Sequence, residues 1–198
     1  MQNITTHEGR VSFPNVFKAQ HNKLSGKDEF TITLLFPKGS EAVAQLKKAF
    51  LEEASKKWGA DAETKLKAPS FKNPLKDGDL ILDLKTGKTR KGYEGMVAVT
   101  FKNEAKPMVV DAAHQEIVNP NDLHGGCYAQ VSATCNAFDV TANKGISFYL
   151  NAVKKTRDGE SFGMARPSID EAFGAPISAG SENPANYGKK DNDLFGGL

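Results

Sequence analysis

The sequence predicts a mainly β fold, a small five-stranded barrel with one principal α-helix, and three observations support this. Segments in which apolar and polar residues alternate recur along the chain, as in half-buried strands. One longer segment carries its apolar residues at helical spacing instead. The long strand predicted over residues 127–138 has a face of small apolar residues, which suits the tight curvature of a closed barrel.

The first two strands are predicted near the N-terminus. In residues 10–17, RVSFPNVF, Val11 and Phe13 alternate with polar neighbours, and Pro14 indicates an edge or a bulge. After a polar turn around Gly26, residues 30–36, FTITLLF, alternate throughout. One face of this strand comprises Phe30, Ile32, Leu34 and Phe36, and the other comprises Thr31, Thr33 and Leu35.

The helix is predicted to begin after Ser40 and to end near Trp58 and Gly59. Ser40 is a favourable N-cap, and Gly59 suits the C-terminal cap. Apolar residues follow helical spacing between these ends, while lysines lie off the apolar stripe. The stripe comprises Val43, Leu46, Phe50 and Ala54.

Residues 60–93 are predicted to be irregular, because prolines and glycines punctuate them. This segment is also the most basic part of the chain, which indicates basic loop insertions in the barrel. Aromatic residues Phe71 and Tyr93 are interleaved with its charges, which belong to Lys72, Lys76, Lys85, Lys88, Arg90 and Lys91.

The remaining strands are predicted over residues 96–101, 108–111, 127–138 and 146–153. In the third of these, odd-numbered residues from Cys127 to Ala137 form the inward face. In the last, the inward residues are Ile146, Phe148, Leu150 and Ala152. The turn VTANKG joins these two long strands as a hairpin.

The C-terminal part of the chain differs in composition from the rest. Residues 174–198 are rich in Gly, Pro, Ala, Ser and Asn and are predicted to be a disordered, mildly acidic tail after a domain of residues 1–173. Of the net charge of +2, residues 168–198 contribute −3 and residues 1–167 contribute +5. A basic body suits a polyanionic ligand, because basic side chains displace counterions from phosphates.

Composition also limits where the protein acts. No run approaches the roughly 18 apolar residues of a membrane span, and residues 1–10 lack the apolar segment of a secretory signal. Cys127 and Cys135 are eight residues apart on one predicted strand, hence about 26 Å apart, so they cannot form a disulfide with each other. Free thiols fit a cytoplasmic protein without a membrane partner.

Catalytic and metal-binding motifs are not found. The chain contains no G-x-S-x-G, no P-loop and no G-x-G-x-x-G, so we expect neither an enzyme nor a cofactor. His124 and Cys127 have metal-ligand spacing, and His114 precedes them, but structural zinc needs four ligands, usually in two close pairs. A loop histidine beside a core cysteine explains them without a metal, so we expect no metal site.

The outward faces of the last two strands combine aromatic and polar side chains. Unstacked nucleobases can cover such aromatic rings, and each stacking contact contributes about 1–3 kcal/mol. The alternative is that the helix or the irregular segment packs over the rings. If bases cover them, the predicted DNA contacts are the basic and aromatic residues Phe71, Lys72, Lys76, Lys88, Arg90, Lys91, Tyr93, Tyr128 and Tyr149.

The ordered segments of the chain resemble a phage-encoded family, first catalogued as a domain of unknown function and then recognised as single-stranded DNA-binding proteins. The resemblance covers about residues 8–173. It rests on RVSFPNVF (10–17), FTITLLFPK (30–38), KNPLKDGD (72–79), GYEGM (92–96), FKNEAKPMVVD (101–111), GCYA (126–129), GISFYLNAV (145–153) and DGESFG (158–163).

This resemblance implies an OB fold, which is a five-stranded Greek-key barrel. It further implies binding to single-stranded DNA without sequence specificity during phage replication, recombination or repair, in the cytoplasm of the bacterial host. It implies no particular oligomeric state.

The last residues resemble the partner-docking tails of single-stranded DNA-binding proteins, in which acidic residues precede a large apolar one. The corresponding residues here are Asp191, Asp193, Leu194 and Phe195. They predict a contact with a replication or recombination protein.

Two other functions remain open at this point. A metal-dependent nuclease or related DNA-processing enzyme would use Asp77, Asp79 and Asp83, although a solvated turn explains these carboxylates as well. A protein-interaction or virion module would instead place the aromatic face against another chain.

Overall fold

The computed structural model describes residues 2–23, 25–140 and 143–162. Five long strands build the barrel: β2 (Gly9–Asn22), β3 (Lys27–Pro37), β6 (Met96–Asn103), β8 (Tyr128–Val140) and β9 (Asn143–Arg157). The short strands are β1 (Gln2–Thr5), β4 (Phe71–Lys72), β5 (Leu75–Asp77) and β7 (Met108–Val110). Helices α1 (Glu41–Trp58) and α2 (Ala62–Leu66) lie between β3 and β4 in the sequence. Short 3₁₀ helices cover Gly59–Asp61, Gly78–Leu80 and Pro120–Asp122.

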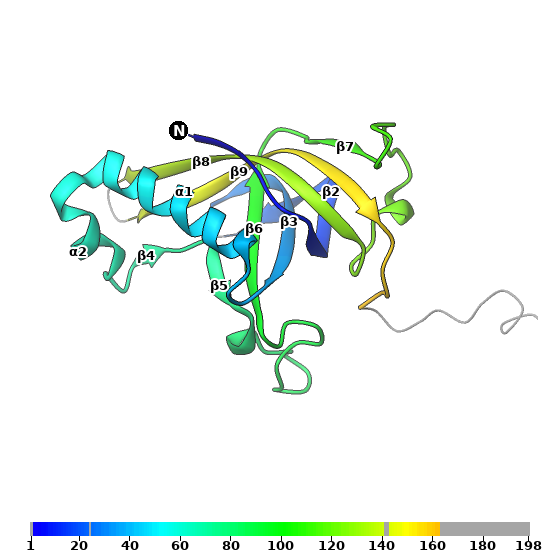
Figure 1. Ribbon diagram of the computed structural model, residues 1–198, viewed down its shortest axis with the longest axis horizontal. Helices are drawn as coiled ribbons and strands as arrows, with labels where there is room; N and C mark the ends of the chain where they lie inside the picture. Colours follow the sequence, from blue (N-terminus) through cyan, green and yellow to red (C-terminus); the bar gives the residue numbers. More distant parts are fainter. Residues whose placement is uncertain (1, 24, 141–142, 163–198) are drawn as a thin grey trace, which may run out of the picture. The chain divides into compact units, whose positions relative to one another are not determined.

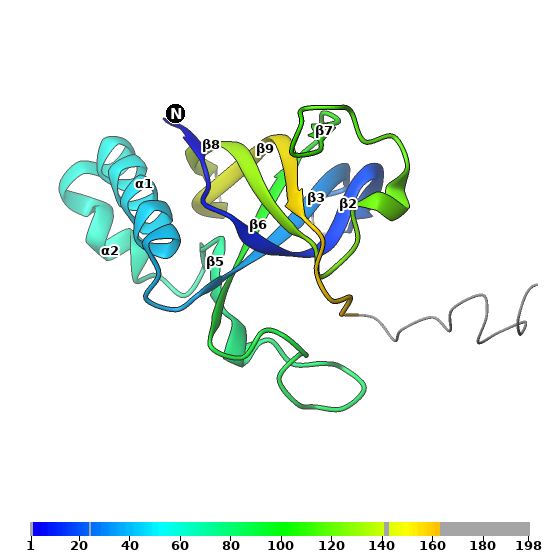
Figure 2. The same cartoon turned by 45° about the vertical axis from the view of Figure 1, so that its right-hand side comes forward.

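The long strands close into a barrel in the order β8-β2-β3-β6-β9, because β8 pairs with both β2 and β9. Neighbours run antiparallel except β6 and β9, which are parallel. Figure 2 shows these strands curving around a common interior. This is the Greek-key barrel of the OB fold, as predicted.

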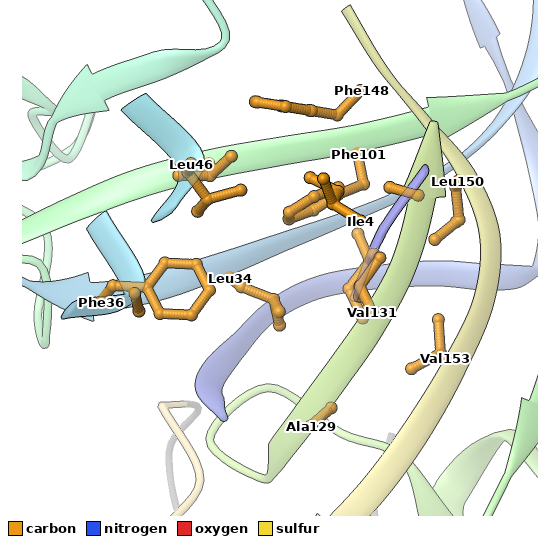
Figure 3. Packing of buried hydrophobic residues seen from close by; sticks show 14 of the residues in the cluster. Ile4, Leu34, Phe36, Leu46, Phe101, Ala129, Val131, Phe148, Leu150 and Val153 are labelled. Carbon is orange, nitrogen blue, oxygen red and sulfur yellow. The ribbon is translucent and has the colours of Figure 1, made fainter. Parts of the chain in front are cut away.

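The barrel interior is filled by alternate residues of all five strands. The inward face predicted for residues 127–138 is confirmed, since Cys127, immediately before β8, and the β8 residues Ala129, Val131, Ala133, Cys135 and Ala137 are all buried. The rings of Phe101 and Phe148 lie 5.6 Å apart at the parallel β6–β9 pair. Figure 3 shows these rings in one cluster with Leu34 of β3, Val131 of β8 and Leu46 of α1. Small residues on β8 leave room for the phenylalanines, which is why one long strand carries few large side chains.

Helix α1 has the predicted ends. The Ser40 hydroxyl accepts a hydrogen bond from the Val43 N–H at 3.4 Å, and Gly59 closes the helix with a positive φ of 54°. The apolar stripe is buried in the same core cluster as the barrel interior. The helix therefore packs as one layer against the sheet formed by β1, β8 and their neighbours (Figure 1).

Three local details differ from the sequence predictions. Strand β1 was not predicted, because only Ile4 of its four residues is buried and so no apolar alternation marks the strand. Pairing with β8 holds β1 in place. The segment 60–93 was predicted to be irregular but contains α2, β4 and β5. On β9 a bulge opposite Ser132 and Ala133 turns Val153 inward in place of the predicted Ala152.

The bulge predicted at Pro14 is present in β2, but it changes the face predicted for Phe13. The register of β2 with β3 shifts between Ser12 and Asn15, and Phe13 lies there with a positive φ of 47°. Val11 is buried, but Phe13 does not share its face and is 51% exposed.

Cys127 and Cys135 are both buried and free. Among the described residues, no helix is long and apolar enough to span a membrane. The predicted tail, its boundary at residue 174 and the docking residues Asp191, Asp193, Leu194 and Phe195 lie outside the residues that the structure describes.

Candidate nucleic-acid interface

A groove of about 640 Å³ crosses the barrel wall at strands β3, β6 and β9. Residues from the β2–β3 turn line one part of it and residues from the ends of β8 and β9 another. The strand residues between them are largely polar. Its lining includes Asn22, Ser25, Lys27, Glu29, Lys72, Asn73, Lys76, Thr100, Lys102, Asn103, Phe138, Val140, Asn143, Ser147 and Tyr149.

The position of this groove follows from the barrel topology. Strands β3 and β6 are the second and third strands of the barrel, and the β2–β3 and β8–β9 turns join its first to second and fourth to fifth strands. In OB folds the face of the second and third strands and these two connections bind oligonucleotides. The groove thus lies where the fold places a nucleic-acid site.

Lys72 and Lys76 reach the groove because short strands hold their segment against the barrel. Lys72 belongs to β4, which pairs in parallel with β9 through Gly145, and Lys76 belongs to β5, which pairs with β6. Both lysines are exposed, and neither forms an ion pair with a residue that the structure describes. Two unpaired ammonium groups at one groove can bind phosphates.

Tyr149 contributes a half-buried aromatic side chain to the groove. Its cross-strand partners are Lys102 on β6 and Thr134 on β8. Phe138, close to the β8–β9 turn, adds a second half-buried ring to the same lining. Aromatic rings flanked by polar and cationic side chains are the stacking platforms that single-stranded nucleic acids use.

Other charges in the groove are paired. Lys102 lies 3.0 Å from Glu29, and Lys27 lies 2.5 Å from Glu104. Burial raises the pKa of Glu29, but hydrogen bonds from Asn22, Lys102 and Ser25 outweigh it, so the pKa lies below its usual value. Glu29 is therefore ionised at neutral pH and holds Lys102 on the groove face.

The structure divides the predicted DNA contacts. Lys72, Lys76 and Tyr149 meet in the groove, whereas the other six predicted residues do not line it. Phe71 packs edge-on against Phe50 and Trp58, with centroid distances of 6.0 and 5.8 Å. Its ring therefore belongs to the packing beneath α1, as the alternative explanation of the aromatics anticipated.

Two of the tyrosines predicted to contact DNA, Tyr93 and Tyr128, instead contact other residues of the protein. Tyr93 is only 2% exposed, and its hydroxyl donates a 2.8 Å hydrogen bond to Ser12, so it has no free face for a base. The guanidinium of Arg157 lies 3.4 Å from the ring centroid of Tyr128 and also binds Glu8. Tyr128 is at the opposite end of β8 from Phe138 and the groove.

The three basic residues at positions 88–91 lie in the segment that follows β5. This segment packs on the outward face of the barrel, where Tyr93 forms a small apolar cluster with Leu35 and Ala98. Lys88 is exposed, and Lys91 lies 3.6 Å from Glu160. Arg90 covers the ring of Phe13 at 4.8 Å.

Several groove residues were not selected from the sequence. Thr100 lies in a predicted strand, whereas Lys27 lies in the predicted turn but belongs to β3, and Lys102 lies one residue beyond the predicted strand in β6. Nothing in the local sequence distinguishes these three residues from other polar residues. Phe138 lies on the outward face of the strand predicted over residues 127–138, but the sequence does not predict it as a DNA contact.

The three carboxylates of the nuclease hypothesis support the protein's own structure. Lys38 lies 2.6 Å from both Asp77 and Asp79, and Asp79 also accepts a 2.6 Å hydrogen bond from the Gly95 N–H. Asp83 accepts bonds from the N–H groups of Lys85 and Thr86 in a separate turn. The Lys38 ammonium lowers the pKa of Asp77 and Asp79, and the two N–H groups lower that of Asp83.

His124 and Cys127 do come together, with Asp158 as an additional neighbour. Their potential ligand atoms lie within 4.8 Å of one another, whereas His114 is not in the group. The Lys155 ammonium lies 2.6 Å from Asp158 and supplies a positive charge there. In the described part of the chain this is the one such group, and it offers three ligands rather than the four of structural zinc.

Comparison with known proteins adds to this geometry. Residues 2–183 match the family model described as the single-stranded DNA-binding protein of Enterobacter phage Enc34. A solved structure of the single-stranded DNA-binding protein from bacteriophage Enc34 in complex with single-stranded DNA superposes with a TM-score of 0.63 at 26% identity, covering 81% of this chain and 89% of that one. Another structure of the Enc34 protein gives a TM-score of 0.60 at 26% identity, covering 86% and 89% of the two chains.

The structure of gp2.5, a single-stranded DNA-binding protein encoded by bacteriophage T7, matches with a TM-score of 0.55 over 84% of this chain and 97% of that one. At 13% identity this likeness supports the fold alone. No curated protein sequence matches the chain. The matching family and the solved structures named above are those of single-stranded DNA-binding proteins.

Proposed function

We propose that this chain, which belongs to the family of the Enterobacter phage Enc34 single-stranded DNA-binding protein, coats and protects single-stranded DNA during phage replication, recombination or repair. The observation that carries the proposal is the groove at β3, β6 and β9. It combines aromatic side chains with two lysines that have no ion pair among the described residues, at the oligonucleotide-binding face of an OB barrel. The site of action that fits this function is the cytoplasm of the bacterial host.

Binding in the groove uses two kinds of contact. Tyr149 and Phe138 each offer a ring to an unstacked base, and every base presents a π-face, so stacking does not select a sequence. Lys72 and Lys76 neutralise phosphates beside the rings. The polar side chains of Thr100 and Asn143 provide further hydrogen bonds at the groove lining.

A stacked and base-paired duplex does not fit these contacts. Its bases present their edges and not their faces, so Tyr149 and Phe138 have no stacking partner. We therefore expect a strong preference for single strands. We propose no catalytic step, because the carboxylates Asp77, Asp79 and Asp83 are held by Lys38 and by backbone N–H groups.

The test is a fluorescence titration of the full chain with labelled oligo-dT and with a duplex of the same length. We expect salt-sensitive binding of oligo-dT and little binding of the duplex. Equal affinity for the two ligands would overturn the proposal. Incubation of labelled single strands with magnesium or manganese should leave them intact.

The variant that tests the groove is Tyr149→Ala. We expect about a 10-fold loss of affinity for oligo-dT, because one base loses its stacking partner. Tyr128→Ala is the matched control, since that ring already carries Arg157. Retained affinity in Tyr149→Ala, with its melting temperature unchanged, would remove Tyr149 from the site.

A second part of the proposal concerns a protein partner. The acidic and apolar residues Asp191, Asp193, Leu194 and Phe195 remain our prediction for contact with a replication or recombination protein. This prediction of a partner contact rests on the residue types alone. Deleting residues 191–198 should leave oligo-dT affinity within a few-fold of the full chain while abolishing co-purification of such a partner from infected cells.

A further inference from the structure

Phe13 is an exposed aromatic residue in a conformation that its side chain disfavours. It lies in the β2 bulge with φ of 47°, a region that bulky residues rarely adopt, and 51% of its surface is exposed. A positive φ at such a residue is energetically unfavourable and persists where the surrounding structure enforces it, often at functional sites. Neither its burial nor a packing role in the core explains why phenylalanine occupies this position.

Arg90 holds the Phe13 ring from one side. Its guanidinium carbon lies 4.8 Å from the ring centroid and 5.8 Å from that of Tyr93. Tyr93 is anchored in turn by its hydrogen bond to Ser12, the residue before Phe13. Arg90 forms no salt bridge with a described acid, although its charge contributes to the lowered pKa of Asp83, and its guanidinium can attract a phosphate beside the ring.

A row of polar side chains leads from the groove to Asn15, two residues from Phe13 in the β2 bulge. Tyr149 on β9 is opposite Lys102 on β6, Lys102 is opposite Thr31 on β3, and Thr31 is opposite Asn15 on β2. Asn15 donates a hydrogen bond to the Thr31 hydroxyl at 3.3 Å. The row crosses three strand spacings, or about 14 Å, a span that a few nucleotides can cover.

We propose that Phe13 and Arg90 form a second nucleotide-binding subsite, at which a base stacks on Phe13 after the strand leaves the groove across the β6–β3–β2 face. The bulge presents the ring to solvent, and Arg90 fixes its orientation and attracts the phosphate. This inference rests on the proposed function, because it extends the path of the same single strand.

The test compares short and long oligo-dT on the full chain and its Phe13→Gly variant. Glycine accepts the positive φ, so the variant should melt within a few degrees of the wild type. An oligomer of about 5 nucleotides, which fills only the groove, should bind both proteins equally. An oligomer of about 15 nucleotides should bind the variant about 10-fold more weakly, because one stacked base is lost.

Two further variants isolate the ring. Phe13→Tyr keeps the aromatic face and should bind the longer oligomer as the wild type does. Met108→Ala removes another exposed apolar side chain, 66% exposed on β7, and should leave binding of both oligomers unchanged.

A single 2-aminopurine base, moved stepwise through the longer oligomer, locates the contact. In the wild type its fluorescence should be quenched by stacking at positions in the groove and at one position beyond it. Phe13→Gly should abolish only the quenching beyond the groove. Wild-type binding of the longer oligomer by Phe13→Gly would overturn the subsite, whereas failure of the wild type to prefer single strands would overturn the proposed function itself.

Discussion

At the scale of single residues, the groove depends on which lysines are left without an acidic partner. Lys27 and Lys102 are paired with Glu104 and Glu29, whereas Lys72 and Lys76 have no ion pair among the described residues. A lysine that is already paired gains less from a phosphate, because it must exchange one anion for another. Lys72 and Lys76 should therefore dominate the electrostatic part of binding.

This difference is measurable as a change in salt dependence. Lys76→Gln and Lys72→Gln should each lower the slope of log affinity against log salt by about 0.7, the contribution of one phosphate in a single strand. Lys48→Gln, an exposed residue of α1 outside the groove lining, is the control and should leave the slope unchanged. Slopes equal to that of the wild type in both groove variants would place the phosphates elsewhere.

At the scale of elements, the two-residue strand β4 decides where Lys72 lies. It pairs in parallel with β9 through Phe71 with Lys144 and Lys72 with Gly145. This close approach requires glycine at position 145, because a Cβ built there would lie 2.4 Å from the Lys72 carbonyl oxygen. The absence of a side chain at Gly145 therefore allows β4, with Lys72, to pair with β9.

Gly145→Ala should displace β4 and with it one wall of the groove. We expect a several-fold loss of oligo-dT affinity and a destabilisation of about 1–3 kcal/mol from the overpacking. Gly125→Ala is the matched control, since the nearest atoms to a Cβ there are at 3.7 and 3.9 Å. The measurements are a binding titration and thermal unfolding; wild-type affinity in Gly145→Ala would show that the position of β4 does not matter for binding.

At the scale of the whole molecule, stability comes from one core shared by the barrel interior and α1. Cys135 lies at this junction, fully buried, with its Sγ 3.7 Å from the Ala49 carbonyl oxygen of the helix. Burial raises the pKa of its thiol to about 12, from a usual value of 9.0. The folded protein therefore keeps this thiol protonated under conditions in which the unfolded chain would ionise it.

The raised pKa of Cys135 makes the folded protein less stable at alkaline pH. Below pH 9 the thiol is protonated in both states, so its contribution to stability is fully present; between pH 9 and about 12 only the unfolded chain loses the proton. The free energy of unfolding should fall in this interval by about 1.4 kcal/mol per pH unit from this residue. Cys135→Ala should lack that component in denaturant unfolding measured across the interval, and identical pH profiles for the two proteins would contradict the assignment.

The sequence by itself determined the mainly β class, the five barrel strands, the helix with both of its caps, and the inward face of β8. These depend on alternation and local residue preferences, which act over a few neighbouring positions. The resemblance to a phage single-stranded DNA-binding family added the OB topology, and with it the function.

Tertiary structure alone decided which predicted residues share a site. Phe71 and Tyr93 carry the same local pattern as Tyr149, but Phe71 lies against Phe50 and Trp58, and Tyr93 is buried against Ser12. Barrel closure brings Lys72, Lys102 and Tyr149 into one groove from segments far apart in the sequence. Burial and proximity depend on the order in which strands pair, and residue composition along one strand does not encode that order.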